Sequence, residues 1–243
     1  MTLPAVLFAS GGGSNVRALL DAHREASGGR PGDSNSPSPS SPSSAPSWFP
    51  ALLVTDRDDA PVLEHAGAHG IPHAVIPPGP DFEGRLLRVL GGAAGGRGAG
   101  MLVLAGYLRL VPPGVVRGWA GRILNVHPSL LPSFGGKGMY GTRIHAAVVA
   151  AGVQVTGVTV HLVDERFDEG PILAQWPVPV LSDDTPASLA ARVLATEHRL
   201  YPAVVEHVAA WLAAHDASAS ADALAAPPSL SASHLLRNGL VFP

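Results

Sequence analysis

Short apolar runs alternate along the chain with segments in which apolar residues recur every three or four positions. A short apolar run bounded by turn residues is typical of a buried strand, whereas the longer spacing is typical of an amphipathic helix. The expected strands cover residues 5–9, 51–54, 74–76, 101–104, 122–126 and 157–163, and the expected helices cover 16–20, 60–69, 82–90, 142–151 and 186–212, the last broken near Pro202. This alternation predicts an α/β fold in which helices flank both faces of a mainly parallel sheet.

Two segments depart from this alternation. Residues 27–46 consist almost entirely of Ser, Pro, Gly and Asn, and they predict a disordered insertion because no apolar side chain can anchor them. Residues 216–233 are rich in Ala and Ser and predict a loosely ordered tail. The remaining pattern is continuous, so we expect a single domain over residues 1–243.

Composition narrows the classes of function. The chain has no Cys, which excludes a disulfide scaffold, thiol catalysis and a Cys-ligated metal. A net charge of -3 without a basic tract argues against nucleic acid or an anionic membrane as the main partner. No apolar run approaches the roughly 18 residues of a membrane helix, and the apolar N-terminus lacks the basic leader of a signal peptide. We therefore expect a cytoplasmic protein that acts on small molecules.

A glycine loop, residues 10–15, joins the first expected strand to the first expected helix. Its sequence is Ser10-Gly11-Gly12-Gly13-Ser14-Asn15. Backbone N–H groups and the positive end of a helix can bind a phosphate there, although a tight turn capped by Asn or Ser explains the loop equally well. Val16 stands where a dinucleotide-binding loop requires its third Gly, and no Lys-Ser or Lys-Thr follows, so a phosphomonoester fits better than NAD or ATP.

Asn125 and His127 close another expected strand, where the period of two directs both side chains to the same side. Taken singly, each of them is more often structural than catalytic. Asp168 follows the strand 157–163 in an acidic loop that could simply be solvated. If the two strands are neighbours, however, Asp168 can reach His127 and favour its imidazolium form. The three residues then predict donors for an oxyanion and a proton relay, which suits transfer of an acyl-type group to a nucleophile on a second substrate.

Several motifs in order carry a family resemblance over residues 5–205. They are Gly11-Gly12-Gly13-Ser14-Asn15, Leu104-Ala105-Gly106-Tyr107-Leu108-Arg109-Leu110, Ile123-Leu124-Asn125-Val126-His127-Pro128-Ser129-Leu130-Leu131-Pro132, Thr156-Gly157-Val158-Thr159-Val160-His161, Asp168-Glu169-Gly170-Pro171-Ile172, Thr196-Glu197-His198 and Tyr201-Pro202. With these motifs the chain resembles the folate-dependent phosphoribosylglycinamide formyltransferases of purine biosynthesis. The resemblance implies a Rossmann-like formyltransferase fold.

The resemblance also implies substrates and residue roles. The cosubstrate would be 10-formyltetrahydrofolate and the acceptor glycinamide ribonucleotide, with no metal. The implied catalytic residues are Asn125, His127 and Asp168, with His161 orienting them. The implied ribonucleotide-binding residues are Gly13, Ser14, Asn15 and Glu197, and the implied folate-binding residues are Arg85, Leu108, Arg109, Leu110, Val111, Asn125, Asp164 and Asp168. The amine of the ribonucleotide would attack the formyl carbon directly, and Asp168 would relay a proton to the departing folate nitrogen.

The chain differs from the family pattern in two places, and one loop has a composition that suggests motion. The insertion at residues 27–46 is unusually long, and Thr55-Asp56-Arg57 stands where many members of the family have Ser-Asn. The loop 133–142 contains four glycines and predicts a mobile lid over the site.

Other formyl-group enzymes remain alternatives. Formyltransferases that act on nucleotide-linked amino sugars share the Asn, His and Asp core, but the glycine loop argues against them. Methionyl-tRNA formyltransferases need a further domain and a basic surface, and formyltetrahydrofolate hydrolases carry an extra N-terminal domain, whereas the first strand here begins by Ala5. A noncatalytic folate- or nucleotide-binding module is the alternative from another class. Whether the chain forms a homodimer is left open.

Overall fold

The computed structural model describes residues 2–28, 45–96, 98–215 and 227–231. Most of the predicted insertion at 27–46 and of the predicted tail at 216–233 therefore lies outside the described residues. The strands are β1 (Leu3–Phe8), β2 (Trp48–Thr55), β3 (His73–Val75), β4 (Met101–Leu104), β5 (Ile123–His127), β6 (Val155–Leu162) and β7 (Ile172–Pro179). The helices are α1 (Ser14–Ala26), α2 (Val62–Ala68), α3 (Phe82–Gly96), α4 (Pro113–Gly118), α5 (Thr142–Ala150) and α6 (Pro186–Ala214).

All the strands join one seven-stranded sheet in the order β3-β2-β1-β4-β5-β6-β7. The strands from β3 to β5 pair in parallel, and β6 and β7 then pair antiparallel. The prediction of a mainly parallel sheet is confirmed, but β7 was missed. This strand contains Pro177 and Pro179 and lies at the edge of the sheet, the position where proline costs no ladder hydrogen bond.

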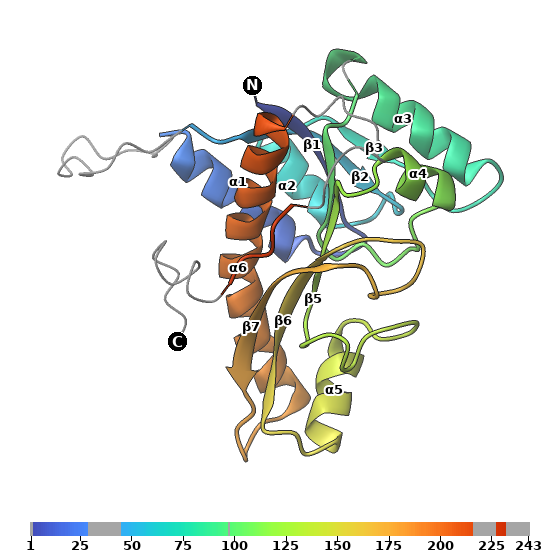
Figure 1. Ribbon diagram of the computed structural model, residues 1–243. Helices are drawn as coiled ribbons and strands as arrows, with labels where there is room; N and C mark the ends of the chain where they lie inside the picture. Colours follow the sequence, from blue (N-terminus) through green and yellow to red (C-terminus); the bar gives the residue numbers. More distant parts are fainter. Residues whose placement is uncertain (1, 29–44, 97, 216–226, 232–243) are drawn as a thin grey trace.

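Helices cover both faces of the sheet, as Figure 1 shows with α3 and α4 on one side and α1 and α6 on the other. The alternation along β1 explains this arrangement. Ala5 and Leu7 pack in the core that includes α1 and α6, whereas Val6 and Phe8 pack in the core that includes α3 and α4. Because both faces of the central strands are buried, their sequences are continuously apolar.

The predicted break of the last helix at Pro202 is wrong. The helix α6 runs without interruption from Pro186 to Ala214, with Pro202 inside it. A proline inside a helix removes one hydrogen bond and costs about 3 kcal/mol. Here Leu200 and Tyr201 before the proline and Val204 after it are completely buried against the sheet, so packing on both sides of Pro202 keeps the helix continuous.

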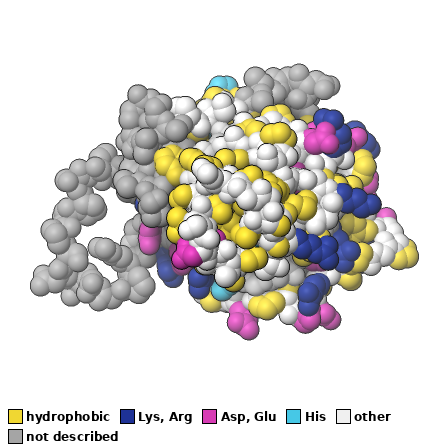
Figure 2. All heavy atoms as spheres, turned by 90° about the horizontal axis from the view of Figure 1, so that it is seen from below, with side chains coloured by type: hydrophobic (Ala, Val, Ile, Leu, Met, Phe, Trp, Pro, Cys, Tyr) yellow, Lys and Arg dark blue, Asp and Glu magenta, His cyan; other side chains and the backbone are white. Residues whose placement is uncertain are grey.

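The face of the molecule seen from below carries both apolar and charged side chains. Apolar and uncharged side chains cover the middle of this face, and basic side chains lie beside acidic ones toward one edge (Figure 2). No continuous basic surface is visible there, in keeping with the net charge of -3. Among the residues that the structure describes, no helix combines the length and the apolar composition that a membrane crossing requires.

The described part of the tail packs on the sheet. The backbone N–H of Leu230 donates a hydrogen bond of 2.7 Å to the carbonyl oxygen of Leu173 in β7. The Leu230 side chain is buried in the core that β7 and α6 share. Residues 227–231 therefore lie along β7 and pair with part of its free edge.

Tyr201 adds a hydrogen bond between α6 and the sheet. Its hydroxyl group lies 2.9 Å from the carbonyl oxygen of Leu104 and 3.2 Å from that of Leu124, so that the two oxygens share its single proton. These carbonyls belong to β4 and β5, the two strands that end beside the cavity described below. The tyrosine thus fixes the height of α6 relative to that end of the sheet.

Replacement of Tyr201 by phenylalanine should lower the free energy of unfolding by about 1–2 kcal/mol, because the buried hydrogen bond from the hydroxyl group to the sheet is lost. Urea denaturation with an unchanged m value measures the loss. The matched control is Tyr140→Phe, since the Tyr140 side chain is 44% exposed and should tolerate the change. Equal losses in both variants would contradict this role of Tyr201.

Candidate functional site

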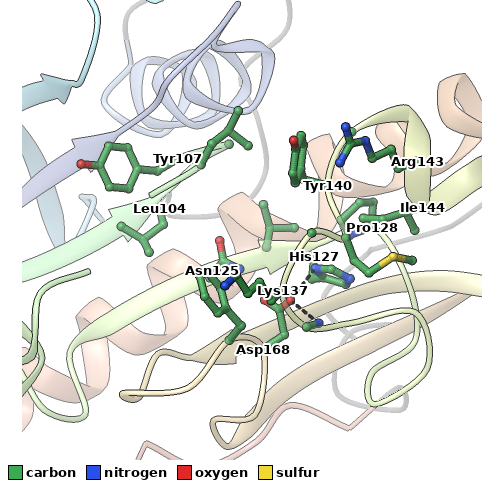
Figure 3. A pocket seen from close by; sticks show the side chains of 18 of the residues that line it. Leu104, Tyr107, Asn125, His127, Pro128, Lys137, Tyr140, Arg143, Ile144 and Asp168 are labelled. Atoms are coloured by element: carbon green, nitrogen blue, oxygen red, sulfur yellow. Dashed lines mark hydrogen bonds and ion pairs between the residues drawn. The ribbon is translucent and has the colours of Figure 1, made fainter. Parts of the chain in front are cut away.

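A cavity of about 660 Å³ lies at the carboxyl ends of β4 and β5. This is the end of a parallel sheet at which α/β proteins usually bind ligands. The walls come from the segment after β4, the end of β5, the loop before α5, the loop after β6 and the buried face of α6. Figure 3 shows Asn125, His127 and Asp168 close together, with Lys137 beside them and Tyr140 farther away.

The three predicted catalytic residues meet in this cavity. Asn125 and His127 lie on β5, and Asp168 lies in the loop that follows β6. The antiparallel pairing of β5 with β6 makes these segments neighbours. His127 Nδ1 lies 3.6 Å from Asp168 Oδ2; the His127 side chain is buried, with an exposed fraction of 5%, and that of Asp168 is 13% exposed. Asp168 has φ of 57°, a left-handed conformation that non-glycine residues adopt mainly where the surrounding structure enforces it.

His161 holds Asn125 in a defined orientation. The two residues are directly opposite each other in the β5–β6 register. His161 Nδ1 lies 2.9 Å from the carbonyl oxygen of Leu162, which can only accept, so Nδ1 carries the proton. Burial lowers the pKa of His161 and favours its neutral form. The unprotonated Nε2 then accepts the amide N–H of Asn125 at 3.1 Å.

The loop before α5 contacts two of the catalytic candidates. The backbone N–H of Gly136 donates a hydrogen bond of 2.9 Å to Asp168 Oδ2. His127 Nε2 lies 3.0 Å from the carbonyl oxygen of Phe134, so it donates to that oxygen. The Nδ1 atom of His127 is consequently the ring atom that faces Asp168. The predicted lid motion of residues 133–142 stays a prediction, but this loop does line the cavity.

The glycine loop, residues 10–15, leads into α1 beside the cavity. Gly13 has φ of 68°, and a Cβ atom there would meet Val62 at 2.3 Å, so this position needs glycine for conformation and for space. Asn15 lines the cavity and donates a hydrogen bond to the carboxyl group of Glu197 on α6, which also lines it. Gly13 and Ser14 are not among the described residues that line the cavity, although they belong to the same loop.

The predicted folate-binding residues separate into two groups. Leu108, Arg109, Leu110 and Val111 all line the cavity, and Leu108 and Leu110 are 57% and 43% exposed there. Arg85 and Asp164 do not belong to the lining. Arg85 donates to the carbonyl oxygen of Pro77, and Asp164 accepts the backbone N–H of Arg166. The structure thus joins the 108–111 segment to the catalytic candidates and leaves Arg85 and Asp164 outside.

Several polar residues that the sequence pattern did not indicate also line the cavity, among them Lys137, Tyr140, Arg143 and His145. His145 is 5% exposed, and burial, with the charge of His127, lowers its pKa. The helical pattern could have indicated that His145 is buried, because it stands between Ile144 and Val148 on the apolar face of α5. Within the described residues, no cluster of His, Asp and Glu could hold a metal ion.

Comparison with known proteins agrees with this geometry. Residues 44–205 match the family described as Formyl transferase, a span of well over half the chain. The chain belongs to the formyl transferase family. Formyl transferases of solved structure share its fold: glycinamide ribonucleotide transformylase 1 from Symbiobacterium toebii matches with a TM-score of 0.70 and 35% identity over 86% of this chain and 89% of that one. The phosphoribosylglycinamide formyltransferase from Brucella melitensis matches with a TM-score of 0.70 and 38% identity, over 86% and 97%. The predicted Rossmann-like formyltransferase fold is therefore confirmed.

Proteins with similar sequences are also named phosphoribosylglycinamide formyltransferase. The chloroplastic phosphoribosylglycinamide formyltransferase of Vigna unguiculata is 41% identical over 201 residues, which cover 82% of this chain but only 59% of that protein. The phosphoribosylglycinamide formyltransferase of Bacillus subtilis (strain 168) is 33% identical over 209 residues, which cover 83% of this chain and 92% of that protein. The chain thus spans about three fifths of the plant formyl transferase and nearly all of the bacterial one.

The buried Glu197 of this formyl transferase predicts a pH-dependent stability. Burial raises its pKa to about 7 from a model-compound value of 4.5, although the Asn15 hydrogen bond opposes the shift. At a pH between 4.5 and about 7, Glu197 therefore keeps its proton in the folded chain but has lost it in the unfolded chain. The free energy of unfolding should therefore fall, by on the order of 3 kcal/mol, as the pH rises through this window, and remain level above it.

Urea denaturation of the wild type and of Glu197→Gln at about pH 5 and about pH 8 tests this sign. The glutamine variant lacks the ionisation and should not show the decrease. Glu64→Gln, a change at an exposed position on α2, should behave as the wild type does. A glutamine variant that loses as much stability as the wild type would contradict the assignment to Glu197.

Proposed function

We propose that this chain transfers the formyl group of 10-formyltetrahydrofolate to the amine of glycinamide ribonucleotide, a step of purine biosynthesis. One observation carries the proposal: the amide of Asn125, the imidazole of His127 and the carboxylate of Asp168 meet within one cavity. The names and the coverage of the bacterial relatives support the choice of substrates.

The cavity suits both substrates. The phosphate of the ribonucleotide would bind at the glycine loop, where Gly13 and Ser14 begin α1 and no acidic side chain occupies its first turn. Asn15 and Glu197 would bind the ribose hydroxyl groups, which a carboxylate accepts well. Elsewhere in the lining, the exposed apolar side chains of Leu108 and Leu110 would enclose the heterocycle of the folate.

Each polar group in the cavity is assigned one step of the proposed reaction. The amine nitrogen attacks the formyl carbon, a C–N bond forms, and the carbonyl oxygen becomes an oxyanion. One N–H of the Asn125 amide donates to His161. The second N–H donates to the oxyanion and stabilises it, together with the Nδ1–H of protonated His127. Asp168 accepts a proton from the attacking amine and passes it to the folate nitrogen, so that the bond between this nitrogen and the formyl carbon breaks.

The compartment and the oligomeric state stay predictions. A cytoplasmic location agrees with the composition, but the names of the two plant relatives place those proteins in the chloroplast. A homodimer is left open, since the proposed site is formed within one chain.

The decisive assay mixes the protein with 10-formyltetrahydrofolate and glycinamide ribonucleotide and follows the release of tetrahydrofolate. Release that depends on the ribonucleotide supports the proposal. Release without it would identify a hydrolase, and release that requires a nucleotide-linked amino sugar would identify that class of formyltransferase. Binding of either substrate without release would identify a noncatalytic module.

Replacement of Asp168 by asparagine should lower kcat by about two to four powers of ten, because the variant cannot accept the proton of the amine. Steady-state turnover with both substrates measures the effect. The control Asp183→Asn changes an exposed carboxylate in the turn before α6 and should retain full turnover. Full turnover of Asp168→Asn would refute the proposed relay.

His161 allows a second test of the same machinery. In His161→Leu the Asn125 amide loses its acceptor, and kcat should fall by up to about a hundredfold with a smaller change in KM. In His161→Gln the side-chain oxygen can still accept the amide N–H, so this variant should retain more of kcat. If the glutamine and leucine variants were equally slow, the hydrogen bond to Asn125 would not explain the role of His161.

A further inference from the structure

Four basic side chains line the cavity at the ends of β4 and β5, and two of them have no acidic partner. Arg109 and Arg166 form ion pairs with carboxylates, at 2.7 Å and 2.6 Å respectively. Lys137 and Arg143 pair with no carboxylate of any described residue. A cavity that presents two unpaired cations favours a ligand with an anionic group.

An aromatic neighbour orients Arg143. Its guanidinium carbon lies 4.9 Å from the centre of the Tyr140 ring, in a cation–π contact. Both side chains are exposed, and both line the cavity. The guanidinium donates no hydrogen bond to another residue of the described chain. Arg143 therefore retains the paired N–H donors with which arginine binds a phosphate or a carboxylate.

A buried histidine adds a polar group without a partner to the same part of the lining. His145 stands two residues after Arg143 in the first turn of α5 and is 5% exposed. It lines the cavity, yet its Nδ1 atom is buried and has no hydrogen-bond partner among the residues described. Buried polar side chains are nearly always hydrogen-bonded, so this exception points to a partner that the protein itself does not supply.

The position of these two residues in the fold indicates which substrate brings the anion. Ile144, which stands between them, packs in the core that α5 shares with α1 and α6. Asn15 and Glu197, the residues proposed for the ribonucleotide, come from α1 and α6. Val111 of the proposed folate segment packs in the core on the other face of the sheet. The beginning of α5 thus lies on the ribonucleotide side of the cavity.

Arg143 is better placed than Lys137 for the phosphate of the ribonucleotide. The phosphate and the attacking amine lie at opposite ends of glycinamide ribonucleotide. Figure 3 shows Lys137 beside Asn125 and Asp168, where the amine has to react, whereas Arg143 is set apart from them. Arg143 is therefore the unpaired basic residue that suits the phosphate end.

We propose that Arg143 and His145 form an anion subsite that binds the phosphate group of the ribonucleotide together with the glycine loop. This inference rests on the proposed function and deepens it, because it adds a full positive charge to a phosphate site otherwise made of backbone N–H groups. Arg143 supplies that charge and two parallel donors, and the ring of His145 supplies one N–H.

The test compares the ribonucleotide with glycinamide riboside, the same compound without its phosphate. In Arg143→Met, kcat/KM for the ribonucleotide should fall by about ten- to a hundredfold through a rise in KM, because a charged hydrogen bond made in the ground state is lost. The value for the riboside should stay close to that of the wild type. Arg143→Lys should recover part of the loss, since it keeps the charge but not the paired donors.

Orthophosphate provides a second measurement that needs no turnover of the riboside. It should inhibit the wild type competitively with the ribonucleotide, and its inhibition constant should rise in Arg143→Met. The matched control is Arg88→Met, which removes an exposed arginine that pairs with Asp81 and should change neither value. His145→Phe should raise KM for the ribonucleotide by about three- to tenfold. A merely structural role of His145 would change the melting temperature and leave this KM unaltered.

The glutamate of the folate is the rival source of an anion. The donor 10-formyltetrahydropteroate lacks this glutamate. If the loss in Arg143→Met disappeared with this donor but persisted with the riboside, Arg143 would bind the folate carboxylate and the proposal would be overturned. Equal losses with the ribonucleotide and the riboside, or an unchanged inhibition constant of orthophosphate, would also overturn it. A wild type that releases no tetrahydrofolate with both substrates would instead overturn the proposed function.

Discussion

The antiparallel pairing of β5 with β6 is the constraint on which the rest of the site depends. It reverses the direction of an otherwise parallel sheet and sets Asn125 directly opposite His161. It also returns the chain across the end of β5, so that Asp168 lies 3.6 Å from the ring of His127. A slip of one residue in this register would turn Asn125 and His127 to the opposite face of the sheet. The continuous apolar core on both faces prevents such a slip, because it would expose Leu124 and Val126 in their place.

Buried hydrogen bonds then hold the segments around the catalytic candidates. Thr159 is fully buried on β6, where its hydroxyl group donates to the carbonyl oxygen of Ser129 and accepts the backbone N–H of Leu131. The turn that follows His127 is thereby fixed to the neighbouring strand. On the other side, Tyr201 joins α6 to the ends of β4 and β5, which brings Glu197 to the cavity one helical turn earlier. Strand β5 and helix α6 therefore carry Asn125, His127 and Glu197, Asp168 comes from the loop after β6, and the loop 133–142 lines another side of the cavity.

The glycine loop and the 107–111 segment, which would bind the two substrates, lie on either side of the place where the strand order reverses. β1 and β4 are adjacent there, and the segments that follow them diverge to form a crevice, which is the usual binding position in open α/β sheets. The backbone N–H of Leu108 donates to Ser10 Oγ at 3.0 Å across these diverging segments, and Arg109 Nε donates to Asp56 Oδ2 at the end of β2. The glycine loop and the 107–111 segment are thus joined directly by a hydrogen bond, although 98 residues separate Ser10 from Leu108 along the chain.

Local patterns in the sequence determined most of the strands and helices, the α/β class and the membership of Asn125, His127 and Asp168 in one site. Such features depend on residues close in the chain, or on motifs that occur together. The tertiary structure alone decided which segments meet: the edge strand β7, the continuous passage of α6 through Pro202, the hydrogen bond of His161 to Asn125, the pairing of Asp56 with Arg109, and the exclusion of Arg85 from the cavity. These features depend on the order in which the strands pair and on the packing of distant side chains. Periodicity records the burial of a residue, but it does not record the neighbour that buries it.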